Sequence, residues 1–411
     1  MLQATGTRAG GRLFRLLIGT LILVSAAAQF ALIPVMPVYA RRFGLSGFEQ
    51  GMVLGATGLA TLVVSVPAGT LSDRFGARRI TLAAGLLMAA ATAAQALAGD
   101  FPALLAARLA FGAGYGMVWT AGLCWLAGAM AGGPPALGAS IASAGVGGVA
   151  GPAVSGALAQ SLGLAVPLLA TAAIFAVITA GLAVLRVPLG PAAPYQAGPP
   201  GLTPAPGNRN LIGAASAVVT AGLSTGVCAL LVPARLHACG ISPGQTGLAF
   251  AVAGILFAVG SALTAAVGRR AVNLPVTCGA ILVQAGALSL AVVGTTPLPL
   301  VAMLCVTTAA RSVLWTVSYP LAASGAASTG LGASVGLLNV IWAATAVLGP
   351  LGAGAAAEHV GTSAAFGLTQ AACAAALAVT AVLTRRPARV APDSSPTPDP
   401  GRIRSRSARR S

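Results

Sequence analysis

The stretch GTLSDRFGARR, residues 69–79, concentrates charge in a chain that has little of it. Only 7% of all residues are charged, yet this segment carries Asp73, Arg74, Arg78 and Arg79. Apolar runs flank it on both sides, at residues 50–70 and 80–98. A short charged segment between two long apolar runs is typical of a loop that joins two membrane-spanning helices.

The whole composition indicates a membrane protein. Hydrophobic residues make up 57% of the chain, and the mean hydropathy is +0.90, well above that of a soluble domain. A helix needs about 20 apolar residues to cross a hydrocarbon core that is ~30 Å thick. Twelve runs of about this length are present, at residues 14–39, 50–70, 80–98, 102–127, 136–159, 165–185, 210–232, 244–267, 274–294, 298–322, 332–356 and 364–384. The sequence therefore predicts an all-α membrane protein with twelve transmembrane helices.

The basic residues predict the orientation of these spans. All 23 of them are Arg, and most fall before the first span, in the even-numbered connections or after the last span. The opposite side holds only Arg41, Arg42 and Arg235. By the positive-inside rule both termini are expected in the cytoplasm, and the protein in the cytoplasmic (plasma) membrane. This bias accounts for the net charge of +17, so we expect no nucleic-acid partner.

The chain divides into two halves. Residues 188–208 are rich in Pro, Gly and Ala and separate six spans from six. The tetrapeptide LGAS opens the fifth span of each half, and a Gly-Pro pair follows in both. We therefore expect two pseudo-symmetric six-helix bundles related by duplication. The expected divisions are a cytoplasmic N-terminus at 1–12, bundles at 13–186 and 210–385, a cytoplasmic linker at 187–209, and a disordered cytoplasmic tail at 386–411.

The opening stretch resembles the signature loop of the major facilitator superfamily, G-x-x-x-D-R-x-G followed by basic residues. Only Ala77 stands where a basic residue is usual. The resemblance implies a major facilitator fold in which this loop is a conformational gate that latches the two halves together. The matching residues are Gly69, Asp73, Arg74, Gly76, Arg78 and Arg79.

The fifth span resembles the antiporter motif of the same family, G-x8-G-x3-G-P-x2-G-G, with Ser155 in place of one Gly. Residues 104–114 resemble a further family motif around Arg108, with Phe111 where Gln is common. These matches imply the twelve-span drug:proton antiporter group. Small residues allow close packing, and a proline bends a helix, so we expect a helix-bend motif at Gly138, Gly147, Gly151, Pro152 and Gly156.

Arg108 and Arg311 are the only charges placed well inside spans. An ionisable group at this depth normally faces a cavity or a partner. Aromatic residues follow each Arg at helical spacing, so we expect both faces to line a substrate site. The alternative is that Arg108 is structural and the aromatics only fill space. The expected substrate-binding residues are Arg108, Tyr115, Trp119, Arg311, Trp315, Tyr319, Gln29, Asn339 and Trp342, with Thr220 and Ser224 as further polar groups.

Acidic residues are absent from the middle of every predicted span. A proton-coupled exporter usually titrates an embedded carboxylate. Either Asp100 or Glu49, near the outer mouth, takes that role, or the coupling differs. The six Cys residues form no CxxC pair, so we expect neither a metal site nor a cofactor.

We interpret the chain as a secondary active transporter and not an enzyme. It would move a small organic compound across the membrane by alternating access, with proton-linked efflux of a drug or metabolite as the first hypothesis. Uptake of a small organic anion is the alternative, because two Arg residues lack acidic partners. A non-transporting membrane sensor or a membrane enzyme is the alternative of another class. The expected partners are the substrate, protons and the lipid bilayer, and we expect a monomer.

Overall fold

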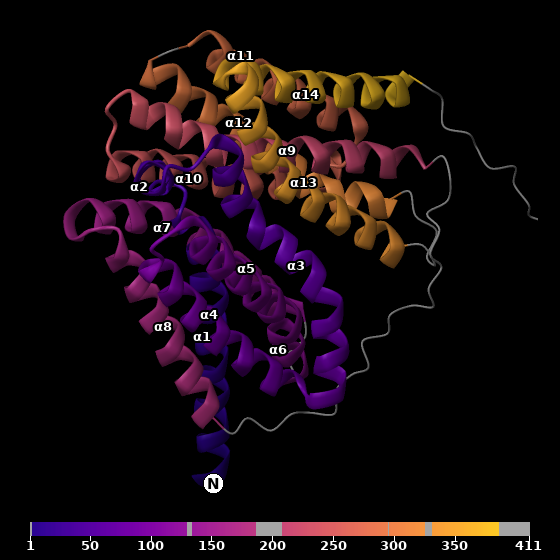
Figure 1. The fold of residues 1–411 in the computed structure, drawn as a ribbon. Coiled ribbons are helices and arrows are strands. Elements are labelled where there is room, and N and C mark those ends of the chain that lie inside the picture. Colours follow the sequence, from indigo (N-terminus) through magenta and orange to yellow (C-terminus); the bar gives the residue numbers. More distant parts are fainter. Residues whose placement is uncertain (1, 130–133, 186–207, 295, 325–330, 386–411) are drawn as a thin grey trace, which may run out of the picture.

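The computed structural model describes residues 2–129, 134–185, 208–294, 296–324 and 331–385, and this part of the chain is built from helices (Figure 1). Eleven of the described helices are long and apolar enough to cross a membrane. Helix α7, Pro134–Leu162, is a further long helix of 29 residues. The prediction of an all-α membrane protein is confirmed.

The helices form two groups that follow the sequence, and Figure 1 shows them as a lower and an upper bundle. The first group comprises α1 (Leu2–Ala31), α2 (Met36–Phe43), α3 (Gly47–Phe75), α4 (Ala77–Leu97), α5 (Phe101–Met117), the π-helical segment η1 (Val118–Gly122), α6 (Leu123–Ala129), α7 and α8 (Ala165–Val184). The second comprises α9 (Arg209–Ala238), α10 (Pro243–Val267), the short 3-10 helix η2 (Gly268–Ala271), α11 (Leu274–Val293), α12 (Pro297–Ser324), α13 (Leu331–Val360) and α14 (Thr362–Arg385).

The first predicted span differs from the expected continuous helix. Helix α1 begins at Leu2 and ends at Ala31, and a turn at residues 32–35 separates it from α2. Pro34 lies in this turn and Pro37 in the first turn of α2. Proline lacks an amide hydrogen and disfavours helical backbone in the residue before it, so a helix is interrupted there. The prediction of one span across residues 14–39 was wrong on this point.

Most of the charged stretch at residues 69–79 is helical, so the loop between the two spans is shorter than its composition indicated. Helix α3 continues through Phe75, and α4 starts at Ala77. Gly76 alone makes the connection, with φ at 90°, a conformation that side chains other than glycine rarely adopt. Asp73 and Arg74 therefore lie on the last turn of α3, and Arg78 and Arg79 lie on the first turn of α4.

The two bundles contact each other mainly along two helix pairs, α3 with α13 and α7 with α10, and α9 also contacts α2 and α3. Glycines make these contacts close. A Cβ on Gly51 would collide with the carbonyl oxygen of Pro350, and a Cβ on Gly247 with that of Pro152. The two Gly-Pro pairs noted in the sequence thus serve the same purpose in both halves, because each proline carbonyl lies against a glycine of the other bundle.

The same symmetry extends to the helix ends beside these contacts. Helices α3 and α10 both begin with a capping box, Ser46 with Glu49 and Ser242 with Gln245. Each also receives a cap from the other bundle. The Phe48 amide donates to Glu358 Oε2 at 3.3 Å, and the Gly244 amide donates to Gln160 Oε1 at 3.1 Å. These side chains satisfy helix-end amides that have no partner within their own helix.

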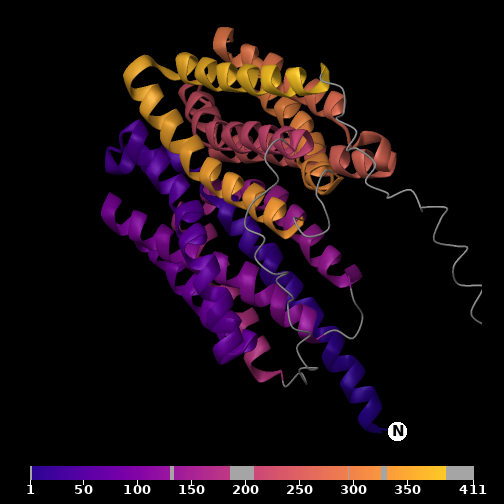
Figure 2. The ribbon, with the colours of Figure 1, turned by 90° about the vertical axis from the view of Figure 1, so that its right-hand side faces the viewer.

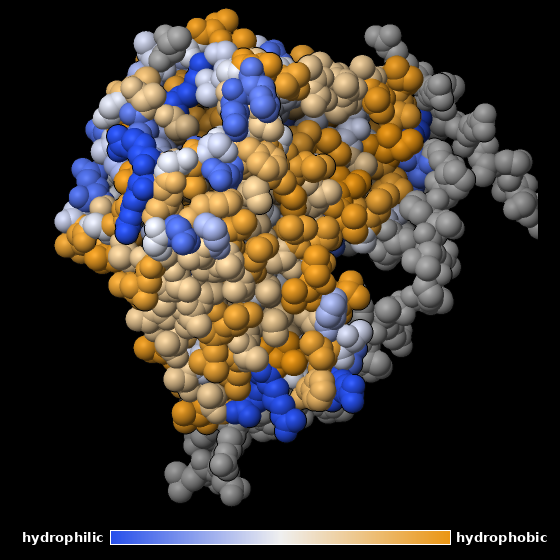
Figure 3. All heavy atoms as spheres, in the orientation of Figure 1, coloured by the Kyte–Doolittle hydropathy of each residue, from blue (hydrophilic) through white to orange (hydrophobic). Residues whose placement is uncertain are grey.

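The bundles separate toward the other end, where α1 begins and α14 ends. On α3, Val63 and Val66 are 64% and 76% exposed, and on α13 Val340 is 53% exposed. Figure 2 looks from this open side, with the second bundle above the first. Figure 3 shows a hollow between the two bundles on the same side, and apolar residues over most of the face. The described part of the molecule is therefore closed at one end and open at the end where α1 begins and α14 ends.

Candidate functional site

Two adjoining cavities lie between the bundles. The larger has a volume of about 220 Å³ and the smaller about 150 Å³. They share wall residues from three long helices, among them Phe30 of α1, Thr225 of α9 and Trp342 of α13. Both bundles thus contribute to one central region, which is where alternating-access transporters place their substrate.

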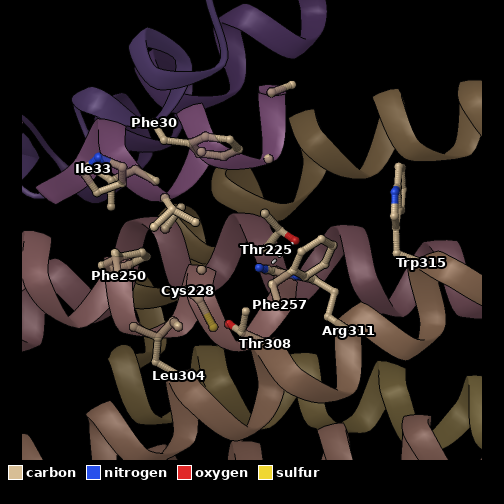
Figure 4. A pocket seen from close by; sticks show the side chains of 18 of the residues that line it. Phe30, Ile33, Thr225, Cys228, Phe250, Phe257, Leu304, Thr308, Arg311 and Trp315 are labelled. Carbon is tan, nitrogen blue, oxygen red and sulfur yellow. Dashed lines mark hydrogen bonds between the residues drawn. The ribbon is translucent and has the colours of Figure 1, made fainter. Parts of the chain in front are cut away.

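Arg311 of α12 is the charged residue in the wall of the larger cavity (Figure 4). Its Nη1 donates to Thr225 Oγ1 at 2.9 Å, and its guanidinium carbon lies 5.5 Å from the centre of the Phe257 ring. Thr308, one helical turn before Arg311, also lines the cavity. Within the described part of the chain, neither the Thr308 hydroxyl nor the other two Arg311 nitrogens have a hydrogen-bond partner.

The rest of the larger cavity is apolar and largely aromatic. Trp315 of α12 and Trp342 of α13 pack against each other, with ring centres 4.6 Å apart and planes at 59°. Phe30, Phe250 and Phe257 contribute three more rings from α1 and α10. A site of this kind suits a flat apolar group, because aromatic faces and edges give a large contact area in defined geometries.

Arg108 of α5 lines the smaller cavity but is only 1% exposed. Its Nη2 donates to the Gln29 carbonyl at 2.6 Å, and its Nη1 donates to the Ala28 carbonyl at 3.5 Å. Its guanidinium carbon also lies 5.1 Å from the centre of the Phe111 ring. The last turn of a helix leaves carbonyls without partners, so Arg108 stabilises the end of α1 where this helix breaks.

The other residues expected at the site divide into two groups. Trp315 and Trp342 line the larger cavity; Gln29, Tyr115 and Trp342 line the smaller one. Trp119, Tyr319 and Asn339 line neither. Tyr319 donates to Asn339 Oδ1 at 2.8 Å, so these two residues pair with each other.

Trp119 follows Phe111 and Tyr115 in a row of packed rings but lies beyond the residues that line the two cavities. Residues 118–122 form a π-helical turn, which begins just before Trp119. Trp119 stacks on Tyr115, with ring centres 5.8 Å apart, and its indole Nε1 is buried with no hydrogen-bond partner in the described residues.

Sequence reasoning missed several cavity residues. On α9 it selected Thr220 and Ser224, which are buried and donate to carbonyls of their own helix. The neighbouring Thr225 is the one that contacts Arg311. A shift of one residue turns a helix by about 100°, so a cavity face cannot be assigned from polarity alone. The other missed residues are Phe30, Cys228, Phe250, Phe257, Leu304 and Thr308.

The expected gate residues lie together at the open end. Asp73 is exposed and has no hydrogen bond or ion pair with any described residue. Arg78 Nη2 donates to the Ala183 carbonyl at 2.6 Å, at the end of α8, and the guanidinium carbon of Arg74 lies 5.2 Å from the Phe75 ring centre. These contacts stay within the first bundle, so the latch between halves remains a prediction. Gly69 faces Thr120 of η1 and Gly76 makes the turn.

The glycines of the expected helix-bend motif pack α7 against its neighbours. A Cβ on Gly147 or Gly151 would collide with the α1 carbonyls of Leu23 or Ala27, and one on Gly156 with the α10 carbonyl of Pro243. Ser155, the departure from the motif, donates to the Ala31 carbonyl at 2.7 Å. The surroundings of Gly138 lie outside what the structure describes, and a bend at Pro152 stays a prediction.

Two six-helix bundles around a central cavity define a membrane transporter of the two-bundle class. Comparison with family models identifies the family: the Major Facilitator Superfamily model matches residues 18–215 and again residues 214–410. The chain belongs to the Major Facilitator Superfamily. The double match agrees with the duplication inferred from the sequence, and the predicted twelve-helix fold is confirmed.

Curated relatives match only part of the chain. The quinolone resistance protein NorA of Staphylococcus aureus is 33% identical over 86 residues, which are 21% of this chain and 22% of that protein. The arabinose-proton symporter of Bacillus subtilis is 35% identical over 101 residues, which are 25% of this chain and 21% of that protein. The chain thus matches about a fifth of the length of these relatives, one a resistance protein and one a symporter.

Solved structures share the fold over nearly the whole chain. A bacterial homologue of the human lysosomal transporter Spinster, in an inward-facing and occupied conformation, superimposes with a TM-score of 0.74. It is 16% identical, and the match covers 90% of this chain and 96% of that one. The nucleoside transporter NupG has a TM-score of 0.71 at 13% identity, with 90% and 99% covered. These similarities concern the fold.

Proposed function

We propose that this protein carries a small organic compound across the cytoplasmic membrane by alternating access, and that it exports the compound in exchange for protons. The observation that carries the proposal is the central cavity, which lies between bundles that meet at one end only. A cavity between two movable rigid bodies can open to either side of a membrane in turn. The chemistry is transport and not an enzymatic reaction.

The direction of opening follows from the Arg distribution. If both termini are cytoplasmic, the open end faces the cytoplasm and the closed α3–α13 and α7–α10 contacts face outward. The described conformation is then inward-facing and ready to load a compound from inside the cell. Loading from the cytoplasm is the first step of export. The resemblance of α7 to the antiporter motif and the partial similarity to NorA support the same direction.

Proton linkage needs a group that can titrate, and no Asp or Glu lines either cavity. Carboxylates lie at the outer contact instead, where Glu358 accepts from the Phe48 amide and Glu49 completes the Ser46 capping box. We propose that proton linkage acts through this contact, because it joins the two bundles at the end that must open to release the compound outside. Asp100 caps α5 through the Ala103 amide and is a less direct candidate.

The test is proton movement in proteoliposomes that contain the protein and an internal pH-sensitive dye. A panel of compounds with fixed charge is added outside at equal pH. An antiporter that carries a compound inward must release protons outward, so the lumen should become alkaline. Protein-free liposomes are the control for leakage. If no compound in a broad panel changes the internal pH, proton-linked exchange is wrong.

Uptake of an organic anion is the second candidate, and Arg311 favours it because a fixed positive charge in the cavity suits an anion. The same assay separates the two functions by sign. A symporter moves compound and protons in one direction, so the lumen should become acidic. If a permanently charged compound acidifies the lumen, the protein is a symporter and not an exporter. The proposal that the central cavity carries the compound would still hold.

A further inference from the structure

We infer that the substrate of the larger cavity is an aromatic or similarly flat apolar compound with one anionic group, and that Arg311 and Thr308 bind the anion. This inference rests on the proposed transport function and adds the chemical class of the substrate. It concerns binding and holds for export or uptake alike. The argument uses the charge of the cavity, the hydrogen bonds of its two Arg residues and the shape of its apolar wall.

The charge of the site is positive without compensation. Arg311 lies in the cavity wall, and no Asp or Glu is among the residues that line either cavity. A positive charge in a region of low dielectric repels a cationic ligand. A neutral ligand would leave the charge of the guanidinium uncompensated. A bound anion, by contrast, offsets the charge of the guanidinium and removes the cost of its desolvation.

The two intramembrane Arg residues differ in the donors they have left. Arg108 is buried, and both of its terminal nitrogens donate to carbonyls of α1, so only its buried Nε has no partner in the described residues. Arg311 is only partly buried, and its single hydrogen bond within the described residues is the one from Nη1 to Thr225. Arg311 therefore keeps donors that a carboxylate, sulfonate or phosphate oxygen can accept. Arg108 has a structural role, whereas Arg311 is the candidate ligand.

Thr308 adds a second donor on the same side of the cavity. It precedes Arg311 by three residues, so both side chains lie on one face of α12. Its hydroxyl has no hydrogen-bond partner in the described part of the chain, although the residue is only 2% exposed. Figure 4 shows the Arg311 guanidinium beside Thr225, and Thr308 lower in the view, next to Cys228. A guanidinium and a hydroxyl on one face of α12 can both donate to an anion in the cavity.

The apolar wall determines the rest of the ligand. Trp315 and Trp342 pack against each other in this wall, and Phe30, Phe250 and Phe257 are its other aromatic residues. A cavity of about 220 Å³ with five aromatic rings favours one compact ring system over a sugar, which would need many polar partners. The class that fits is a monoanion whose charged group sits next to an aromatic or flat apolar body.

The test measures binding to the purified protein, without a gradient, by quenching of tryptophan fluorescence. Trp315 and Trp342, two of the four Trp residues, line the cavity and report on it. Three probes share a benzene ring and differ in charge: toluenesulfonate, neutral toluenesulfonamide and benzyltrimethylammonium. We expect toluenesulfonate to bind at least about tenfold more tightly than the sulfonamide, and the cation not to bind.

Variants of Arg311 locate the effect. Arg311→Gln should weaken toluenesulfonate about tenfold to a hundredfold and leave the sulfonamide within about twofold, because only the charge-assisted bonds are lost. Arg311→Lys keeps the charge but loses the planar fork, so its affinity should lie in between. Arg270→Gln removes an Arg at the open end, outside the cavity, and should bind all three probes as the unmodified protein does.

Three results would overturn the inference: no saturable binding of toluenesulfonate, equal affinity for all three probes, or an undiminished preference for the anion in Arg311→Gln. Thermal unfolding of each variant shows whether the fold is retained. If Arg311→Gln does not fold, Thr308→Val provides the same test with a smaller expected loss, about threefold to tenfold. Binding is measured without proton flow, so failure here leaves the transport assay untouched, and failure of proton coupling leaves this result standing.

Discussion

At the scale of single residues, the two intramembrane Arg side chains have different environments. The sequence predicted that both would face the substrate, with a structural Arg108 as the alternative. The hydrogen bonds favour that alternative for Arg108, which holds the broken end of α1 through the Ala28 and Gln29 carbonyls. Arg311 has one hydrogen bond to another side chain and lies in the cavity wall. The position of each Arg inside a predicted span identified both as candidates. Only their hydrogen-bond partners distinguish the two roles.

This difference predicts opposite phenotypes. Arg108→Met should leave the α1 carbonyls without a buried partner and destabilise the fold by about 1–3 kcal/mol, which lowers the midpoint of thermal unfolding in detergent. Arg108→Lys retains a donor and should lose less. Arg311→Gln should unfold close to the temperature of the unmodified protein. An unchanged midpoint for Arg108→Met would mean that the carbonyl contacts contribute nothing and would return Arg108 to the candidate ligands.

At the scale of helices, glycines set the distance between bundles. Helices α3 and α13 approach so closely that Gly51 touches the backbone of Pro350, and α10 and α7 repeat this with Gly247 and Pro152. Lipid is as apolar as the helix surfaces, so the hydrophobic effect does little to bring helices together in a membrane. Close backbone packing of this kind is therefore a main source of helix association. The closed end is therefore held by shape, with the Glu358 and Gln160 caps added at its rim.

Gly51→Ala and Gly247→Ala should shift the conformational equilibrium toward opening of this end. The added methyl would meet a carbonyl oxygen, which cannot move without its helix. The measurement is labelling by a membrane-impermeant maleimide of a cysteine placed at the buried Ala353, in a protein whose native Cys residues are replaced by Ser. Labelling should be at least about threefold faster in both variants.

Gly286→Ala on α11 is the matched control, because a Cβ there meets nothing within 4 Å. It should label at the same rate as the parent protein. Equal rates in all three variants would contradict the assignment of the α3–α13 contact as the element that keeps this end closed.

At the scale of the whole molecule, the two bundles meet at one end and the signature stretch lies at the other. Asp73 is exposed and unpaired within the described residues, at the end where the bundles are apart. A latch that forms only when this end closes would be open in the described conformation. A pairing made in one of two conformations biases the equilibrium between them and leaves the other conformation unaffected.

Asp73→Asn should therefore reduce transport strongly, by about tenfold or more, without lowering thermal stability or membrane insertion. The substitution keeps the shape of the side chain and removes the charge that strengthens its hydrogen bonds. Flux in proteoliposomes and the unfolding midpoint of the inward-facing protein are the two measurements. Transport at the unmodified rate would show that the stretch only sets topology through its Arg residues.

The sequence by itself determined the membrane class, the span count, the duplication and the family. These properties depend on composition, on the length of apolar runs and on motifs that are local in the chain, so they can be inferred from the linear sequence. The same is true of the presence of two intramembrane Arg residues. The charge of a residue and its approximate depth follow from its position in a span.

Only the tertiary structure decided which residues meet. The break at Ala31 and the π-helical turn at Val118–Gly122 are local departures from a regular helix that the apolar runs did not indicate. Thr225 rather than Ser224 contacts Arg311, because one residue along a helix turns the side chain by about 100°. Cavity walls are assembled from helices far apart in sequence, and their relative rotation depends on packing that no single helix encodes.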